Sequence, residues 1–107
     1  MLSFDTDQSV DVFTVETLPD RQRVIVAPRG ELDIATVEYV AAEMDALVSS
    51  GFADLVLDLR AVRFMDVAGL RLVLGQVRRA DANVELIDGP PAVSRLFELA
   101  GLRLVER

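Results

Sequence analysis

The sequence predicts an α/β fold, in which a small mixed sheet of about four or five strands packs against about three or four helices. Two observations lead to this class. Segments rich in β-branched residues alternate with segments whose apolar residues recur at helical spacing, and the connections between them are short. The resulting order is ββαβαβαβ. Strand–helix–strand units imply parallel neighbours with right-handed crossovers, so the central strands end at one shared edge of the sheet.

The first half of the domain is predicted from β-branched runs and one helical stripe. It contains strands over residues 12–18 and 23–27, a helix over 37–48 and a strand over 54–59. The connection between the first two strands is short, which favours an antiparallel hairpin. Pro28 indicates a bulge or an edge position, and Gly30 permits a sharp change of direction. Asp33 or Thr36 is the candidate N-cap of the helix.

The second half continues the alternation of helices and strands. It contains a helix that follows Asp66 and extends to about Ala80, a strand over 84–87, a helix from the turn at 88–91 to Ala100, and a short strand over 102–105. Gly101 is the expected C-terminal cap of the last helix. Three loops, over residues 30–35, 64–69 and 88–91, therefore lie at the shared edge. Partners and ligands usually bind at this edge in open α/β sheets.

The composition bounds the domain organisation and excludes several functions. The 107 residues suit one domain over 12–107, preceded by a flexible arm over 1–11 that is poor in apolar residues. A formal charge of −7 does not suit nucleic acid as a partner. Without His, Cys or Lys the usual bases and nucleophiles are missing, so no enzyme is expected. No signal peptide or membrane-spanning run is present, which predicts a cytoplasmic protein.

Carboxylates near the shared edge have two interpretations. Asp33 and Asp66 form a candidate pair for acid–base work or a hard metal ion. Both precede helices, however, and helix capping is the simpler role for an aspartate there. Asp88 is interpreted as a turn residue before Gly89. Capping therefore leaves no metal ion expected, and without a glycine-rich phosphate motif no nucleotide or other cofactor is expected either.

The second predicted helix carries two further features. Gly69 and Gly75 lie six residues apart and are interpreted as allowing close backbone packing or the approach of a partner. Arg71, Arg78 and Arg79 form either an interaction patch or a solvated face. The sequence leaves both alternatives open.

Two motifs resemble those of a known family. Residues 30–33 read Gly-Glu-Leu-Asp, and residues 58–70 read Asp-Leu-Arg-Ala-Val-Arg-Phe-Met-Asp-Val-Ala-Gly-Leu. In order and separation these motifs resemble a STAS domain of the anti-sigma factor antagonist type, and the resemblance covers about residues 12–105. It implies a small sheet with helices packed against it and a non-catalytic signalling adaptor.

The resemblance also implies a partner and a switch. Similar proteins bind an anti-sigma factor, a serine kinase of the histidine-kinase-like ATPase type, which phosphorylates a Ser or Thr directly after the motif aspartate. That position is Val67 here and Ala68 follows, so neither residue offers a hydroxyl. We therefore expect binding without the usual phosphorylation switch. Thr36 is an alternative phosphoacceptor, with helix capping as its simpler role.

We expect protein binding at the shared edge. The expected contact residues are Asp33, Phe64, Met65, Asp66, Val67, Ala68, Gly69, Leu70 and Arg71. The alternative function is that of a STAS subunit in a lipid-transport or other membrane-associated assembly. A homodimer is compatible with either function.

Overall fold

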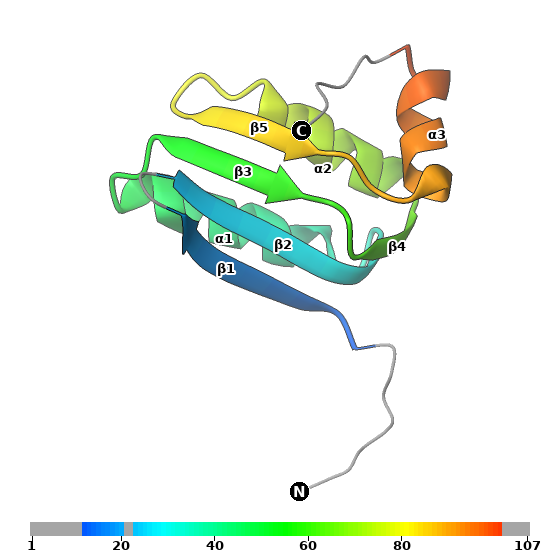
Figure 1. Ribbon diagram of the computed structural model, residues 1–107, viewed down its shortest axis with the longest axis horizontal. Coiled ribbons are helices and arrows are strands. Elements are labelled where there is room, and N and C mark those ends of the chain that lie inside the picture. Colours follow the sequence, from blue (N-terminus) through cyan, green and yellow to red (C-terminus); the bar gives the residue numbers. More distant parts are fainter. Residues whose placement is uncertain (1–11, 21–22, 102–107) are drawn as a thin grey trace, which may run out of the picture.

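The computed structural model describes residues 12–20 and 23–101, and over this part of the chain it confirms the predicted α/β class (Figure 1). The elements are β1 (Thr14–Asp20), β2 (Arg23–Leu32), α1 (Val37–Ser49), β3 (Asp54–Asp58), β4 (Val62–Met65), α2 (Val67–Val77), β5 (Asn83–Ile87) and α3 (Pro91–Leu99). The predicted arm over 1–11 and the predicted strand over 102–105 lie outside the described residues.

The sheet is mixed and has the strand order β1-β2-β3-β5 (Figure 1). β1 and β2 form the predicted antiparallel hairpin, with Thr14 opposite Arg29 and Leu18 opposite Ile25. β2, β3 and β5 run parallel to one another. Their carboxyl ends consequently lie at one edge of the sheet, as predicted from the strand–helix–strand units. Because β1 is antiparallel, its first residue lies at this same edge.

β4 is a strand that the sequence pattern does not predict, since its second half falls in the loop expected over residues 64–69. It pairs in parallel with the last residues of β2, so that Glu31 lies opposite Phe64 and Leu32 opposite Met65. The register shifts between Gly30 and Glu31, where Gly30 adopts a φ of +112°, a value that favours glycine. Otherwise the described elements follow the predicted order, with β4 added between β3 and α2.

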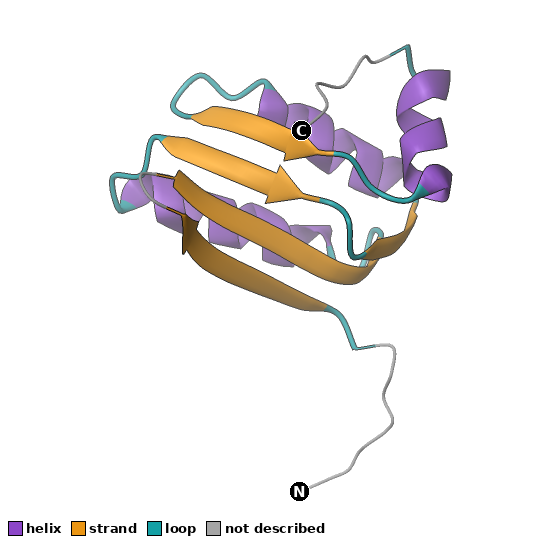
Figure 2. Ribbon diagram, in the orientation of Figure 1, coloured by secondary structure: helices purple, strands orange, loops and turns teal. Residues whose placement is uncertain are grey.

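The hydrophobic core lies between one face of the sheet and the helices. α1 and α2 cover the same face, whereas α3 packs at the end of the sheet beside β4 (Figure 2). Alternate residues of β2 point into the core, as the period of a strand requires. The most deeply buried side chains are those of Val26, Leu32, Val40, Met44, Leu57, Leu59, Val62, Val73, Val93 and Phe97. Along the described residues no helix has the length and apolar character needed to cross a membrane.

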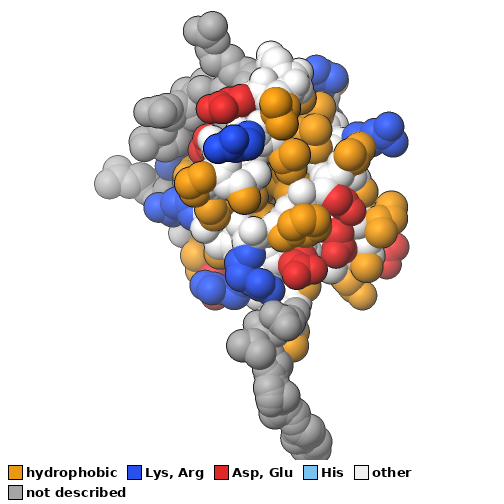
Figure 3. All heavy atoms as spheres, turned by 90° about the vertical axis from the view of Figure 1, so that its right-hand side faces the viewer, with side chains coloured by type: hydrophobic (Ala, Val, Ile, Leu, Met, Phe, Trp, Pro, Cys, Tyr) orange, Lys and Arg blue, Asp and Glu red, His pale blue; other side chains and the backbone are white. Residues whose placement is uncertain are grey.

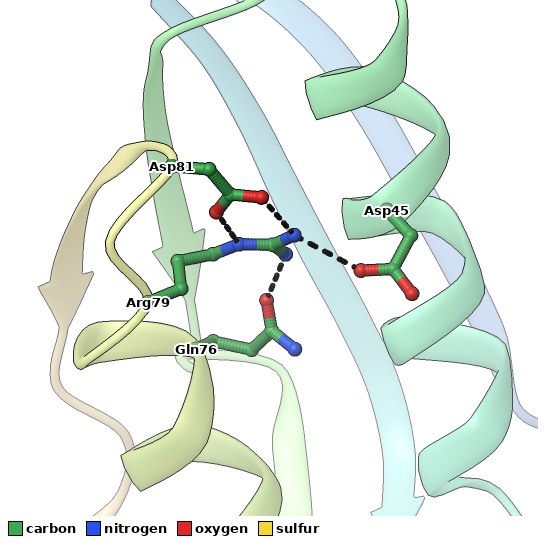
Figure 4. A network of polar contacts seen from close by, with 4 residues as sticks. All are labelled: Asp45, Gln76, Arg79 and Asp81. Carbon is green, nitrogen blue, oxygen red and sulfur yellow. Dashed lines mark hydrogen bonds and ion pairs between the residues drawn. The ribbon is translucent and has the colours of Figure 1, made fainter.

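A polar network fixes the end of α2 against α1 (Figure 4). The guanidinium of Arg79 donates to Asp81 at 2.7 Å, to Gln76 at 2.8 Å and to Asp45 on α1 at 3.1 Å. Arg79 has only 16% of its side chain exposed, so it belongs to the scaffold rather than to an interaction patch. The chain leaves the helix after Val77, earlier than the apolar periodicity predicted, and turns so that these contacts form.

Candidate functional site

The three predicted loops meet at the edge where β2, β4 and β5 end. This edge faces the viewer in Figure 3, where hydrophobic side chains gather with acidic and basic side chains beside them. The turn before α1, strand β4 and the first turn of α2 contribute to it. Hydrogen bonds from a few side chains hold these segments together beneath the exposed surface.

Asp66 connects the first turn of α2 to the turn before α1. It occupies the N-cap position, and its Oδ1 accepts a hydrogen bond from Gly69 N at 3.0 Å. Its Oδ2 accepts from Ile34 N at 3.3 Å. The predicted capping role is therefore confirmed, and each carboxylate oxygen already accepts a backbone N–H. Among the described residues, no group of three or more His, Cys, Asp or Glu side chains could hold a metal ion.

Asp33 and Thr36 hold the turn before α1. Asp33 Oδ1 accepts from Ala35 N at 3.0 Å. The hydroxyl of Thr36 donates to Glu31 O at 2.7 Å and accepts from Asp33 N at 3.0 Å. Thr36 occupies the N-cap position but its side chain makes no capping hydrogen bond. Its hydroxyl is therefore engaged by the turn, which gives this residue a structural role.

Gly69 lies where α2 crosses the end of β2. A Cβ atom at this position would collide with the carbonyl oxygen of Leu32 and would lie 2.6 Å from Cγ of Met65. Only glycine therefore allows α2 to pack this closely on the strand. Met65 is itself 4% exposed. Gly69 and Met65, both predicted contact residues, lie in the interior and support the edge from beneath.

Three exposed apolar side chains lie at the surface of the edge. Val67, the first residue of α2, is 60% exposed and Phe64 on β4 is 49% exposed. Ile34 is 76% exposed, and its backbone N–H binds Asp66, so it lies beside the first turn of α2. Single exposed apolar residues are ordinary, but these three belong to segments that meet at one edge of the sheet. We call Ile34, Phe64 and Val67 the apolar edge.

Sequence reasoning missed Ile34 as a member of this surface. The available signal was a large β-branched residue inside a turn, between Asp33 and Ala35, where polar residues are usual. Of the remaining predicted contact residues, Ala68 and Leu70 are half-buried, and Leu70 packs against the core. Arg71 is exposed on the outer face of α2.

Asp58 stabilises the connection that carries β4. This buried residue ends β3, and its carboxylate accepts hydrogen bonds from the backbone N–H of Arg60 and from its Nε, both at 3.0 Å. A third bond joins the Arg60 guanidinium to Oδ2 at 2.9 Å. Burial opposes ionisation of Asp58, but the hydrogen bonds and positive charge of Arg60 outweigh it. The pKa of Asp58 is therefore lowered from its ordinary value.

Asp88 holds the third loop of the edge, before α3. Its Oδ1 accepts from Gly89 N at 2.7 Å, and its Oδ2 accepts from the hydroxyl of Ser94 at 2.8 Å. A Cβ atom at Gly89 would lie 2.9 Å from the carbonyl oxygen of Leu59, so this turn also packs closely. The interpretation of Asp88 as a turn residue is confirmed.

Comparison with known proteins gives consistent results. The model of the STAS domain family matches residues 12–106. An anti-sigma F factor antagonist of Lysinibacillus sphaericus is 31% identical over 86 residues, which cover 77% of this chain and 74% of the relative. The structure of the anti-sigma factor antagonist SpoIIAA in its unphosphorylated form is similar with a TM-score of 0.70 and 26% identity, covering 90% of this chain and 88% of that chain.

SpoIIAA of Bacillus has also been solved in its phosphorylated form. That structure is similar with a TM-score of 0.66 and 25% identity, over 90% of this chain and 91% of that chain. The family match includes every described element and both motifs that carried the resemblance. The chain belongs to the STAS domain family.

Proposed function

We propose that this chain acts as an anti-sigma factor antagonist, a non-catalytic cytoplasmic adaptor. Its partner would be an anti-sigma factor of the histidine-kinase-like ATPase type, bound through the apolar edge of Ile34, Phe64 and Val67. The names of the relatives support an anti-sigma factor as the partner. The exposure of these apolar side chains supports the place, because burying them on a partner would remove apolar surface from water.

The observation that carries this proposal is the position of Val67. It directly follows the capping residue Asp66 and is exposed at the N-terminus of α2. In similar proteins the resemblance places the phosphorylated Ser or Thr here. A helix N-terminus attracts an anion, so a phosphate would be held at this position and would add nearly two negative charges to the binding surface. Val67 offers an apolar contact that a kinase cannot modify.

We therefore infer that binding is constitutive and is not released by phosphorylation at residue 67. The hydroxyl of Thr36 is not proposed as a substitute phosphoacceptor, because it donates to Glu31 O within its turn. Phosphorylation of Thr36 would remove this hydrogen bond and disrupt the turn that carries Ile34.

The test measures binding and phosphorylation together. The chain is mixed with each purified ATPase-type anti-sigma factor of the source organism and with ATP. Binding is measured by calorimetry and phosphate incorporation by mass spectrometry. We expect the wild-type chain to bind one of them and to gain no phosphate.

Two variants sharpen this test. Val67→Ser should gain one phosphate and then lose affinity at least tenfold, because charge replaces an apolar contact. Val67→Ala is the matched control, which lacks a hydroxyl and should stay unmodified. Phosphate on the wild-type chain, accompanied by release of the partner, would overturn the constitutive part of the proposal. Binding to none of these proteins, together with recovery of a lipid-transport complex from cells, would favour the alternative of a membrane-associated subunit.

A further inference from the structure

The outer face of α2 extends away from the apolar edge. Val67, Arg71, Gly75 and Arg78 recur at spacings of four and three residues, so they lie within one quarter of the helix circumference. All four are exposed. The opposite sides of the helix pack on the sheet and on α1. These four residues therefore form an exposed row that begins at Val67, which is also part of the apolar edge.

Gly75 in the middle of this row has no structural reason to be glycine. A Cβ atom there would meet no atom of the described residues within 4 Å, and the backbone is not in the left-handed region. Glycine is the weakest helix former apart from proline, so its presence costs stability. Gly69 in the same helix has the opposite surroundings, because its Cβ would collide with β2. The missing side chain at residue 75 leaves the helix backbone open to close approach from outside.

Arg71 and Arg78 lie on either side of Gly75. Arg71 and Arg78 are exposed, and within the described part of the chain they form no ion pair or side-chain hydrogen bond. Arg79, one residue further, instead binds three side chains. In a chain with a net charge of −7, acidic side chains are abundant, yet none of those in the described residues pairs with these two arginines. Their forked guanidinium groups suit carboxylates in bidentate geometry.

We infer that an acidic segment of the partner lies along this face, with its backbone over Gly75 and carboxylates on Arg71 and Arg78. The inference rests on the proposed function and names the chemistry of the partner. Arg71 and Arg78 are seven positions apart along the helix, which corresponds to a rise of about 10 Å. Acidic residues three apart on an extended segment, or seven apart on a helix, span about the same distance. The surface thus selects a spacing of acidic residues as well as a charge.

The test compares three variants in binding to the purified anti-sigma factor that the wild-type chain binds. Reversal of both charges, in Arg71→Glu with Arg78→Glu, should weaken binding at least tenfold. Gly75→Gln fills the open space with a good helix former, so it should raise the melting temperature by about 4 °C and weaken binding at least tenfold. Arg95→Glu, a charge reversal on the exposed side of α3, is the control for charge outside this face and should leave affinity unchanged.

The outcomes separate failure of the acidic-segment inference from failure of the proposed function. Wild-type affinity should also fall as salt is raised, because exposed charge pairs are screened. Full affinity in Gly75→Gln, or in the double charge reversal, would overturn the acidic segment while leaving the apolar edge intact. Equal loss in Arg95→Glu would overturn it too, since the effect would then be one of net charge. Absence of binding by the wild-type chain would overturn the proposed function and this inference together.

Discussion

Residues 64–70 have an inner and an outer side with different tasks. On the inner side, Met65 and Gly69 pack beneath the edge and Asp66 binds two backbone N–H groups. On the outer side, Phe64 and Val67 are exposed. The end of a strand sends alternate side chains to opposite faces, and the first helical turn does the same over a few residues. One short stretch can therefore specify the fold and present a binding surface without conflict between the two.

The largest expected effect is on the inner side, at Gly69. Gly69→Ala forces a Cβ onto the backbone of Leu32, so it should lower the free energy of unfolding by about 3 kcal/mol. Gly75→Ala is the same substitution in the same helix at an open position, and it should raise the free energy of unfolding by about 1 kcal/mol. Urea denaturation measures both. Equal effects at the two positions would contradict the division into inner and outer sides.

The next largest effect concerns Asp66. Asp66→Ala leaves the N–H groups of Gly69 and Ile34 without their partner, which should cost about 2 kcal/mol of stability. Asp66→Asn keeps the capping acceptor and loses the second one, so it should cost about half as much. Thermal unfolding of the two variants separates the contributions. If Asp66→Ala were as stable as the wild-type chain, Asp66 would belong to the outer side.

A smaller, pH-dependent effect is expected from Asp58. Its pKa is lowered in the folded chain, so the unfolded chain binds more protons and ionised Asp58 stabilises the fold. This contribution is complete above the ordinary pKa of 3.8 and is lost as pH falls through the lower folded value. Arg60→Gln should therefore destabilise the chain at pH 7, and less so towards pH 3. Arg71→Gln, at an arginine that pairs with none of the described residues, is the control, and a parallel loss at all pH values would refute this assignment.

The smallest effects on stability are expected on the outer side. Phe64→Ala and Ile34→Ala should each change the free energy of unfolding by no more than about 0.5 kcal/mol, because both side chains are exposed. Binding to the anti-sigma factor should fall at least tenfold in each, as at a hot spot. Phe52→Ala, at a similarly exposed phenylalanine after α1, is the matched control and should bind normally. Unchanged affinity in Phe64→Ala would remove β4 from the proposed surface.

Several features of the site could be predicted because they depend on residues close together in the chain. The capping role of Asp66 follows from one aspartate before an apolar stripe, and Asp88 before Gly89 indicates a turn in the same way. The shared edge follows from the alternation of strands and helices, since each crossover makes the next strand parallel. These rules need no knowledge of distant contacts.

Other features arise from contacts between distant segments. β4 exists because three of its four residues pair with the end of β2, some thirty positions earlier, and a run of four residues is too short to be recognised by its periodicity alone. Arg79 was predicted beside Arg71 and Arg78, but its pairing with Asp45 on α1 turns it away from them. Gly69 and Gly75 are the same residue type in the same helix, and only the atoms around each position distinguish their roles.

The sequence by itself determined the α/β class, the parallel strands with one shared edge, and the loss of a hydroxyl at residue 67. These features depend on periodicity, turn residues and residue identity, all of which can be read locally. The tertiary structure alone decided which side chains of the edge are exposed. Exposure depends on what packs against a residue, so Ile34 is part of the exposed surface whereas Met65 and Gly69 are buried beneath it.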